Sequence, residues 1–462
     1  MFKPLSFSEL ALVLDGRHVG ADCSFTGVSI DSRSIVPGQL FIALTGPNFD
    51  GHDYLAQVAA KGAVGALVDR EVEGAPLPQL VVSDTRKALG QLGALNRNAF
   101  VDKPVAAMTG SSGKTTVKEM LASILRTRGT VLATRGNLNN ELGVPLTLLE
   151  LAPEHAAAVI ELGASRIGEI AYTVSLTKPH VAIITNAGTA HVGEFGGPDK
   201  IVEAKGEILE GLSATGVAVL NRDDKAFALW KARAGSRQVL SFAVSDTKAD
   251  FHAHHVTLDA RGCPGFTLRS PAGVGLVQLN LLGAHNVANA LAAAAAAHAL
   301  GVTLEGIVTG LNTVKPVKGR TVAQLATNGV RVIDDTYNAN PTSVNAAVDI
   351  LTGFTGRTVL VLGDIGELGD WAEQGHRDVG AYAAGKISAL YAVGPLTAYS
   401  VAAFGQDARH FANQTDLIAA LAADERDTNT TILIKGSRSA AMENVVAALC
   451  GSQTDPLKAE KH

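Results

Sequence analysis

A glycine-rich segment is the part of the sequence whose residue types and spacing point most directly to chemistry. Residues 110–116 read Gly-Ser-Ser-Gly-Lys-Thr-Thr. Glycines let a backbone turn tightly and approach an anion closely, and free N–H groups at the start of a helix attract phosphate. In such loops the lysine reaches the terminal phosphates of a nucleotide, and the hydroxyl after it binds Mg²⁺. The segment therefore predicts a nucleotide-phosphate site with Lys114 on phosphate and Thr115 on Mg²⁺. The other loop residues are Gly110, Ser111, Ser112, Gly113 and Thr116.

The residues around this loop predict the elements that position it. Val105–Met108 is a short apolar run, typical of a buried parallel strand. After the loop, apolar residues recur at the spacing of one helix face, at Val117, Met120, Leu121, Ile124 and Leu125. The full motif G-x-x-x-x-G-K-[ST] has a glycine where this chain has Met108, so the match is to a shortened form. A glycine-rich turn with a chance lysine is the alternative, and the flanking strand and helix argue against it.

Three more polar residues follow predicted strands or lie on the next helix. Glu161 ends the apolar run 156–160, and His191 follows the run 181–186 after a loop. Because functional groups gather at the carboxyl ends of parallel strands, both can converge with Thr115. Glu161 is placed like the acidic residue that holds Mg²⁺ beside a phosphate loop. Taken alone, Glu161 could also be a solvated carboxylate, His191 a structural histidine, and Lys205 a solvated lysine on a helix over 200–212.

Other polar segments have both a structural and a functional interpretation. Asp31-Ser32-Arg33 comes at a predicted strand end, where a hydroxyl and a guanidinium could hold a pyrophosphate or simply form a turn with a surface ion pair. The loop Asn48–Asp53 could be merely a turn. Asn286 and Asn289 flank the first turn of an alanine-rich helix, where capping would explain Asn286.

Composition limits the class of protein. The chain has 462 residues, which at about 150 residues per domain predicts three domains. Apolar residues make up 47% and charged residues 18%, so we expect a large core and little disorder. The net charge of −5, without a block of like charge, argues against nucleic-acid binding. Three distant cysteines suit a reducing cytoplasm. We expect no signal peptide and no membrane-spanning segment.

Alternating strands and helices predict an α/β protein of three units. Residues 1–85 read as a small mixed α/β unit. Residues 86–316 surround the loop and predict a central, mostly parallel sheet, followed by short strands at 217–220, 239–244, 255–258 and 277–282. Residues 317–462 repeat a strand–helix alternation and predict a Rossmann-like unit, although no G-x-G-x-x-G occurs there to support a dinucleotide site.

Together these motifs resemble the Mur ligases of peptidoglycan synthesis over nearly the whole chain. The resemblance rests on Gly110–Thr116, Glu161, Thr185-Asn186 with His191, Glu203-Ala204-Lys205, His285–Ala290 and Gly319-Arg320. It implies a UDP-sugar-binding domain at 1–85, an ATP-binding domain at 86–316, and a C-terminal domain at 317–462 for ATP and D-alanyl-D-alanine. Domain closure is implied as well, because water must be kept from a reactive intermediate.

Within the family, four segments are similar to the members that join D-alanyl-D-alanine to UDP-N-acetylmuramoyl-tripeptide. They are Asp31–Arg33 with Asn48–Asp53, Gly136–Pro145, Asp334–Pro341 and Leu362–Gly369. The Asp-Asn-Pro-Arg sequence of the diaminopimelate-adding members does not occur. The resemblance implies that ATP converts the tripeptide carboxylate into an acyl phosphate, which the amine of the dipeptide attacks. The protein would contribute mainly positioning and charge neutralisation.

The resemblance also implies roles for single residues. Lys114 would contact the β- and γ-phosphates, Thr115 and Glu161 would hold a first Mg²⁺, and His191 with a carbamylated Lys205 would hold a second. Carbamylation would turn the lysine into a carboxylate-like ligand. The remaining assignments are Asn289 near adenine, Arg320 on the γ-phosphate, Asp335 near the ribose or phosphates, Ser32, Arg33 and Asn48 on the UDP sugar, Asn139 and Asn140 toward the peptide, and Asp364, Lys435 and Arg438 on the acceptor side.

Two alternatives stay open at the level of sequence. A folylpolyglutamate-type ligase would lack the UDP-binding unit, so Asp31–Arg33 and Asn48–Asp53 argue against it. A nucleotide-driven conformational switch would turn over ATP without a small-molecule acceptor. We expect a cytoplasmic monomer that binds neither nucleic acid nor membrane. The sequence leaves open whether the third residue of the tripeptide is diaminopimelate or lysine.

Overall fold

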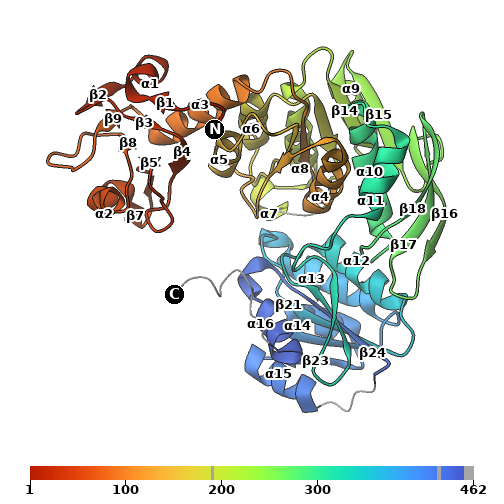
Figure 1. The fold of residues 1–462 in the computed structure, drawn as a ribbon. Coiled ribbons are helices and arrows are strands. Elements are labelled where there is room, and N and C mark those ends of the chain that lie inside the picture. Colours follow the sequence, from red (N-terminus) through yellow and green to blue (C-terminus); the bar gives the residue numbers. More distant parts are fainter. Residues whose placement is uncertain (189–191, 424–427, 452–462) are drawn as a thin grey trace.

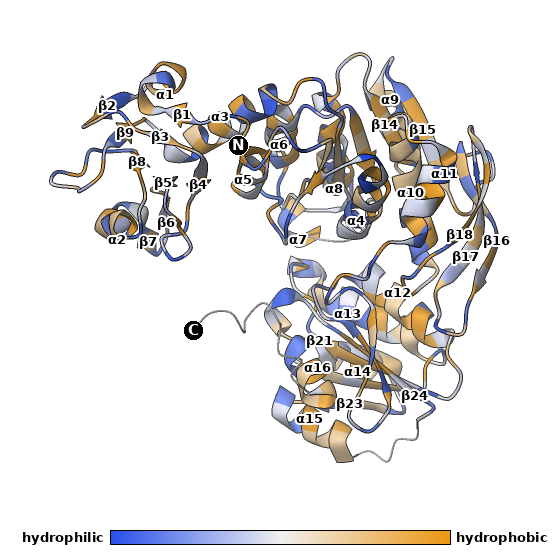
Figure 2. Cartoon of the chain, in the orientation of Figure 1, coloured by the Kyte–Doolittle hydropathy of each residue, from blue (hydrophilic) through white to orange (hydrophobic). Residues whose placement is uncertain are grey.

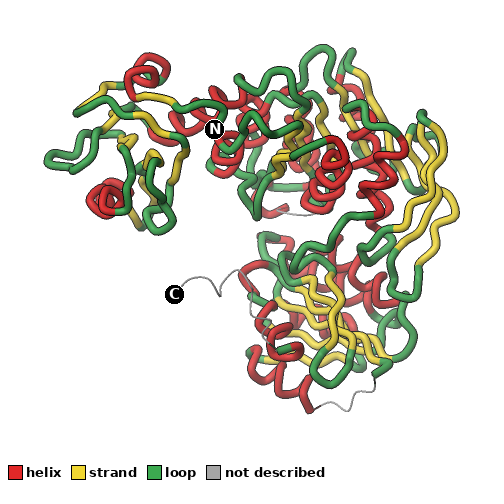
Figure 3. Tube along the Cα trace, viewed as in Figure 1, coloured by secondary structure: helices red, strands yellow, loops and turns green. Residues whose placement is uncertain are grey.

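The strands of this chain form three main sheets, one in each of three successive bodies (Figure 1). The structure is a computed structural model that describes residues 1–188, 192–423 and 428–451. In Figure 1 the N-terminal body lies to one side of the middle body, and the C-terminal body lies below the middle one. Figure 3 shows the same path with helices and strands distinguished. The predicted three-part α/β fold is confirmed, with mostly parallel strands in each sheet.

The N-terminal body is built on a five-stranded sheet in the order β2-β9-β8-β5-β4. The pairings β9–β8, β8–β5 and β5–β4 are parallel, and only β2–β9 is antiparallel. The sheet strands are β2 (Arg17–Val19), β4 (Gly27–Ser29), β5 (Gln39–Ile42), β8 (Gly65–Val68) and β9 (Gln79–Val81). The other elements are β1 (Leu5–Ser6), α1 (Phe7–Val13), β3 (Ser24–Phe25), the hairpin β6 (Thr45–Gly46) and β7 (Phe49–Asp50), the 3₁₀ helix η1 (Gly51–Tyr54) and α2 (Leu55–Ala60).

The middle body is organised around β10 (Val105–Thr109), the strand that leads into the phosphate loop. The nine-stranded sheet has the order β11-β12-β10-β13-β14-β15-β16-β17-β18, parallel as far as β16 and antiparallel after it. Alternate residues of β10 enter two different apolar clusters, Ala106 and Met108 in one and Val105 and Ala107 in the other. The strand is therefore buried on both faces, which explains its continuous apolar run.

Helices cover both faces of this sheet. One cluster packs α4 (Lys114–Leu125), α10 (His285–Ala299) and α11 (Leu304–Asn312) on the sheet, and the other packs α5 (Gly143–Leu149), α6 (Glu169–Thr177) and α9 (Phe227–Ala234). Figure 2 shows the hydrophobic character along α10. The remaining elements are α3 (Thr85–Asn98), η2 (Arg126–Arg128), β11 (Val131–Ala133), β12 (Ala157–Glu161), β13 (Val181–Ile184), α7 (Val192–Phe195), α8 (Pro198–Gly206), η3 (Glu207–Gly211), β14 (Val217–Asn221), β15 (Gln238–Ala243), β16 (Phe251–Leu258), β17 (Pro264–Ser270) and β18 (Gly273–Gln278).

The C-terminal body is a six-stranded sheet between two layers of helices. The strand order is β19-β20-β24-β21-β22-β23, parallel except for the edge pair β19–β20. The strands are β19 (Val322–Leu325), β20 (Arg331–Asp335), β21 (Arg357–Gly363), β22 (Ala389–Val393), β23 (Ala408–Phe411) and β24 (Thr430–Lys435). The helices are α12 (Pro341–Thr352), η4 (Gly369–Trp371), α13 (Ala372–Ala383), α14 (Thr397–Phe404), α15 (Gln414–Ala423), η5 (Arg438–Ala440) and α16 (Glu443–Cys450).

Three predicted elements differ from the observed ones. The strand predicted at 255–258 is β16, which begins earlier, at Phe251. The strand predicted at 277–282 is β18, which ends at Gln278, because the hairpin pairs Ser270 with Gly273 and Gly265 with Gln278. Leu279, Leu281 and Leu282 are buried in the following loop instead. The helix predicted at 200–212 is α8 followed by the 3₁₀ helix η3. No helix among the described residues combines the length and the apolar character needed to cross a bilayer.

The close packing of α11 on α4 gives a test of the fold. A Cβ at Gly310 would lie 2.3 Å from the Cα atom of Ile124, a backbone atom of α4. Replacing glycine by alanine inside a helix ordinarily stabilises the helix by about 1 kcal/mol. At Gly310 we expect the steric clash with α4 to outweigh that gain. We therefore expect Gly310→Ala to lower the free energy of unfolding by about 1–3 kcal/mol in urea denaturation.

Gly306→Ala is the matched control on the same helix, because its Cβ would meet the Val302 side chain at 3.0 Å instead of a backbone. Gly306→Ala should lower the free energy of unfolding by less than half as much as Gly310→Ala. A Gly310→Ala protein as stable as the wild type would contradict this packing.

Candidate active site

The phosphate loop has a backbone conformation that requires its two glycines. Gly110 has φ +150° and Gly113 has φ +81°, and α4 begins directly after Gly113. A Cβ at Gly110 would lie 1.9 Å from Thr185 Oγ1, and one at Gly113 would lie 2.4 Å from Asn289 Oδ1. The loop is thus closed in by neighbouring side chains while the N-terminus of α4 faces the position where a phosphate would bind.

Residues at the end of β13 hold this loop in place. The Ser111 N–H donates to the carbonyl oxygen of Asn186 at 3.0 Å, and the Ser112 N–H donates to Asn186 Oδ1 at 3.0 Å. Thr185 Oγ1 donates to the carbonyl oxygen of Ser112 at 2.6 Å. The sequence alone indicated no role for the Thr185-Asn186 pair. The signal for a role is its position at the end of the strand next to β10.

The hydroxyl of Thr115 and the carboxylate of Glu161 lie side by side. Thr115 Oγ1 donates to Glu161 Oε2 at 3.0 Å, and Asn139 Nδ2 donates to Glu161 Oε1 at 2.9 Å. The Glu161 N–H donates to Thr134 Oγ1 at 2.9 Å. Glu161 is almost fully buried, so each of its oxygens is directed by a specific donor. No sequence pattern had pointed to Thr134 as a site residue.

Two lysines in this region have lowered pKa values. Lys114 Nζ donates to the carbonyl oxygen of Gly110 at 2.7 Å, and burial lowers its pKa although Glu161 acts in the opposite direction. Lys205 is only 2% exposed. Burial, and secondarily the charge of Lys114, lowers the pKa of Lys205 from 10.5 to about 7. No described residue accepts a hydrogen bond from Lys205 Nζ, which lies 5.1 Å from the ring centroid of Phe195. The predicted ligand His191 lies outside the described residues.

The oxygen atoms at this site suit a hard cation. Among the described residues there is no group of three or more His, Cys, Asp or Glu that could hold a metal ion. However, Mg²⁺ at a nucleotide commonly takes one or two protein oxygens and completes its coordination with phosphate and water. The adjacent oxygens of Thr115 and Glu161 fit that requirement.

The C-terminal body reaches the loop through Arg320. Arg320 Nη2 donates to Thr115 Oγ1 at 3.3 Å, while its guanidinium lies 4.1 Å from the ring centroid of Tyr337. Close by, the buried Lys435 Nζ contacts Asp335 Oδ2 at 2.5 Å, and the N–H of Thr321 donates to Asp335 Oδ1 at 3.1 Å. Asp335 and Lys435 therefore hold the segment that carries Arg320.

Asp364 and Arg438, both predicted on the acceptor side, have contacts of other kinds. Asp364 Oδ1 accepts hydrogen bonds from the N–H groups of Leu396 at 3.0 Å and Thr397 at 2.9 Å, at the start of α14. Arg438 forms an exposed ion pair with Glu443 at 2.7 Å. In the structure these side chains support local geometry, and their predicted contact with the acceptor stays a prediction.

The N-terminal body carries the residues predicted to hold the UDP sugar on its loops. Arg33 is 85% exposed at its side chain and pairs with Asp31 at 2.8 Å, in a turn that follows β4. The carbonyl oxygen of Ser32 accepts a hydrogen bond from Lys61 at 2.9 Å. Asn48 is exposed in the turn between β6 and β7. The surface ion pair is thus present, and it leaves the guanidinium accessible to a ligand.

The asparagines at 139–140 and 286–289 have distinct positions. Asn140 Oδ1 accepts from the N–H of Gly143 at 2.9 Å, at the start of α5, whereas Asn139 faces Glu161. Asn286 does not cap α10, because its amide donates to the carbonyl oxygen of Leu282 at 2.7 Å. Asn289 Nδ2 donates to Asn286 Oδ1 at 2.9 Å, which holds Asn289 beside Gly113.

Comparisons with known proteins agree over almost the full length. Three family models match: the Mur ligase family catalytic domain at residues 24–97, the Mur ligase middle domain at 108–297, and the Mur ligase glutamate ligase domain at 319–438. The chain is 46% identical to UDP-N-acetylmuramoyl-tripeptide–D-alanyl-D-alanine ligase of Escherichia coli strain K12, over 96% of this chain and 98% of the relative.

Solved structures are also similar over most of the chain. A crystal structure of MurF from Acinetobacter baumannii has a TM-score of 0.92 and 42% identity, covering 98% of this chain and 100% of the other. The MurF ligase from Thermotoga maritima in complex with ADP has a TM-score of 0.82 and 26% identity, covering 91% of this chain and 96% of the other.

The lowered pKa of Lys205 makes stability depend on pH. Between about 7 and 10.5 the unfolded chain binds a proton at this lysine that the folded chain does not. The stability of the wild type relative to Lys205→Met should therefore rise with pH above about 7, by at most about 1.4 kcal/mol per pH unit, and stay constant below it. Urea unfolding in CO₂-free buffers at several pH values measures this difference.

Lys231→Met, at an exposed position of α9, is the control and should give no such rise. A stability difference between wild type and Lys205→Met that is independent of pH would contradict the lowered pKa.

Proposed function

This chain belongs to the Mur ligase family, and we propose that it uses ATP to join D-alanyl-D-alanine to UDP-N-acetylmuramoyl-tripeptide. The observation that carries the proposal is the convergence of Lys114, Thr115 and Glu161 with Arg320 from the next body. A site assembled from two bodies suits a reaction that brings a nucleotide and two further substrates together.

Each body has its own part in this proposal. Residues 1–85 would bind the UDP sugar through Ser32, Arg33 and Asn48. Residues 86–316 would bind ATP, with Asn289 beside the loop toward the adenine. Residues 317–462 would bind the dipeptide and, through Arg320 and Asp335, part of the nucleotide. The hydrogen bond from Arg320 to Thr115 supports a nucleotide site shared by the middle and C-terminal bodies.

The first step would form an acyl phosphate. An oxygen of the terminal tripeptide carboxylate attacks the γ-phosphorus of ATP, the bond from that phosphorus to its bridging oxygen breaks, and ADP leaves. Negative charge accumulates on the phosphate oxygens, and Lys114 and Arg320 lie where they can neutralise it. The position of Asn289 behind Gly113 would hold the loop against the nucleotide.

The second step would form the amide. The amine of D-alanyl-D-alanine attacks the acyl carbon and loses a proton, the carbon–oxygen bond to phosphate breaks, and inorganic phosphate leaves. The acyl phosphate must be shielded from water until then. The contact between Gly193 and Gly369, where a Cβ at Gly193 would meet backbone at 2.5 Å, supports closure of the middle and C-terminal bodies over the site.

The proposal includes two Mg²⁺ sites, which would offset phosphate charge when occupied. Thr115 and Glu161 would hold the first. Lys205 and His191 would hold the second, provided that Lys205 is carbamylated. A lysine with a pKa of about 7 is partly neutral at physiological pH, and a neutral amine can attack CO₂ to form a carbamate with loss of a proton. We also infer that the enzyme works as a monomer in the cytoplasm.

A phosphate-release assay tests the reaction itself. With Mg²⁺-ATP, phosphate should appear only when UDP-N-acetylmuramoyl-tripeptide and D-alanyl-D-alanine are both present, with a product heavier by the dipeptide less one water. Lys114→Ala should lower kcat by about 10²–10³-fold or more, because a charge-neutralising donor is lost. Lys231→Ala, remote from the loop, should leave kcat unchanged.

Other outcomes of this assay have distinct meanings. Release of phosphate without either substrate would indicate a nucleotide-driven switch. Ligation to glutamate or another acceptor in place of the dipeptide would indicate a different amide ligase and overturn the substrate assignment.

The proposed carbamate gives a rescue experiment. Lys205→Ala should be nearly inactive, and added acetate should restore part of its activity by placing a carboxylate where the carbamate would lie. Lys114→Ala should not respond to acetate. In the wild type, ¹³C-bicarbonate should give a carbamate signal in carbon NMR that Lys205→Ala lacks. No rescue at any acetate concentration, together with no such signal, would exclude the carbamate.

A further inference from the structure

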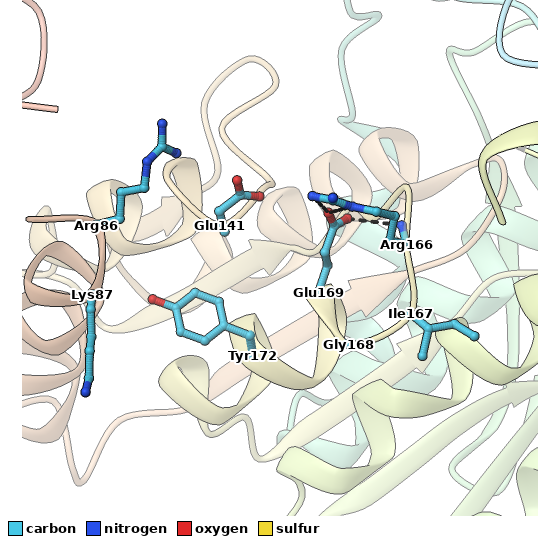
Figure 4. Close-up of a pocket in the computed structure, with 8 residues that line it drawn as sticks. All are labelled: Arg86, Lys87, Glu141, Arg166, Ile167, Gly168, Glu169 and Tyr172. Carbon is cyan, nitrogen blue, oxygen red and sulfur yellow. Dashed lines mark hydrogen bonds and ion pairs between the residues drawn. The ribbon is translucent and has the colours of Figure 1, made fainter. Parts of the chain in front are cut away.

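Lys118 on α4 is a buried cation that has no part in the reaction steps described above. Its side chain is only 2% exposed. Cations elsewhere on the chain lie at the surface. Figure 4 shows an example, the cavity at the starts of α3 and α6, where the exposed Arg86 and Lys87 point in opposite directions and Arg166 pairs with Glu169. Because burial of an ammonium is unfavourable without compensating partners, the partners of Lys118 indicate what its burial achieves.

Lys118 has one buried partner and one partly exposed partner. Its Nζ atom donates to the carbonyl oxygen of Thr134 at 2.6 Å and lies 3.0 Å from Glu119 Oε1. The Glu119 side chain is 29% exposed, so water can solvate that carboxylate with or without the lysine. Thr134 is almost completely buried, and a buried carbonyl needs a donor from the protein. Thr134 is therefore the partner that depends on Lys118.

Thr134 lies where the hydrogen-bond ladder between β11 and β12 ends. The two strands pair in parallel up to Ala133 and Val159, and the N–H of Thr134 donates to the carbonyl oxygen of Val159 at 3.1 Å. In a continuing parallel ladder the next bond would join the N–H of Glu161 to the carbonyl oxygen of Thr134. That N–H donates to Thr134 Oγ1 at 2.9 Å instead, while the carbonyl oxygen accepts from Lys118. The ammonium thus occupies the carbonyl, and the hydroxyl replaces it as acceptor.

Helix α4 consequently supports Glu161 at two points. Thr115 and Lys118 are three residues apart on the helix, so their side chains lie on the same side of it. Thr115 contacts the Glu161 carboxylate directly, whereas Lys118 acts on the Glu161 backbone through Thr134. A change in the backbone at residue 161 would move the carboxylate relative to the Thr115 hydroxyl. Mg²⁺ demands near-ideal ligand geometry, so a cation shared by these two groups would be sensitive to that change.

We propose that Lys118 is a positioning residue that sets the Glu161 carboxylate for Mg²⁺ by holding the Thr134 carbonyl out of the β11–β12 ladder. The inference rests on the proposed function, in which Thr115 and Glu161 hold Mg²⁺. Without the ammonium, the Thr134 carbonyl accepts the Glu161 N–H, the ladder extends by one bond, and the carboxylate turns away from Thr115. Loss of a residue that orients a metal ligand typically weakens metal binding about 10–100-fold.

Nucleotide binding with and without Mg²⁺ tests this role apart from turnover. We would titrate the wild type and Lys118→Met with the non-hydrolysable analogue AMP-PNP by calorimetry, once with saturating Mg²⁺ and once with EDTA. Lys118→Met should raise the Kd measured with Mg²⁺ about tenfold and the Kd measured with EDTA less than about twofold. During ligation, the Mg²⁺ concentration that gives half the maximal rate should rise by a similar factor, while KM for UDP-N-acetylmuramoyl-tripeptide stays constant.

Thr134→Val should have the same signature, because it removes the hydroxyl that accepts the Glu161 N–H and keeps the size of the side chain. This variant tests the proposal even if Lys118→Met does not fold. Since both residues act through one hydrogen-bonded unit, the double variant should raise the Kd with Mg²⁺ no further than the stronger single variant. A double variant whose effect is the product of the two single effects would overturn the route through Thr134.

Two controls separate this route from other causes. Glu119→Gln removes the other partner of Lys118 and leaves the bond to Thr134 in place. Lys231→Met changes an exposed lysine on α9. Both should leave the Kd of AMP-PNP unchanged under either condition. A Glu119→Gln protein with the same loss as Lys118→Met would show that the ion pair, and not the Thr134 carbonyl, is what matters.

The failure of this inference differs from the failure of the proposed function. A wild type that binds AMP-PNP no better with Mg²⁺ than with EDTA, or that ligates no substrate, would overturn the proposed function. A wild type with Mg²⁺-dependent binding that Lys118→Met and Thr134→Val leave intact would overturn only the role of Lys118. An equal loss of affinity with Mg²⁺ and with EDTA would do the same, because it would indicate general damage to the nucleotide site.

Discussion

The candidate site depends on one constraint, the position of β10 between β12 and β13 in a parallel sheet. The pairing sets Met108 beside Glu161 and Thr109 beside Ile184, so three strand ends meet at the same edge. The phosphate loop follows one strand, Glu161 ends the second, and Thr185-Asn186 follows the third. A shift of one residue in either pairing would turn these side chains to the opposite faces of their strands. The hydrogen bonds from Ser111 and Ser112 to Asn186 can form only in this register.

The middle and C-terminal bodies are coupled through apolar packing as well as through Arg320. One apolar cluster contains Val192, Phe195 and Ile201 from the middle body together with Ile333 and Leu360 from the C-terminal one. Arg320 lies between Thr115 and the ring of Tyr337, and the Asp335–Lys435 pair fixes the segment around it. Movement of the C-terminal body would therefore move a cation relative to the phosphate loop, which is a direct way to link domain closure to chemistry.

Burial of cations is the energetic cost of this arrangement. Lys205 has almost no contact with solvent and no acceptor among the described residues, and the nearby Lys114 increases its cost. A buried amine without a partner is unfavourable for folding. Such an arrangement is typical of sites whose groups are matched to a ligand more than to stability.

The sequence by itself determined the three-part α/β organisation, the phosphate loop and the family, because apolar runs and glycine spacing are local properties of the chain. It also indicated Thr115 and Glu161 together, since both follow strands of one parallel sheet. Only the tertiary structure decided that Thr134 supports Glu161 and that Asn186 holds the phosphate loop. It also decided that Asn286 bonds Leu282 instead of capping α10, and that Asp364 binds the start of α14. It alone brought Arg86, Glu141 and Tyr172 around one cavity. These contacts join residues far apart in the chain, and no local pattern encodes which distant side chains packing will bring together.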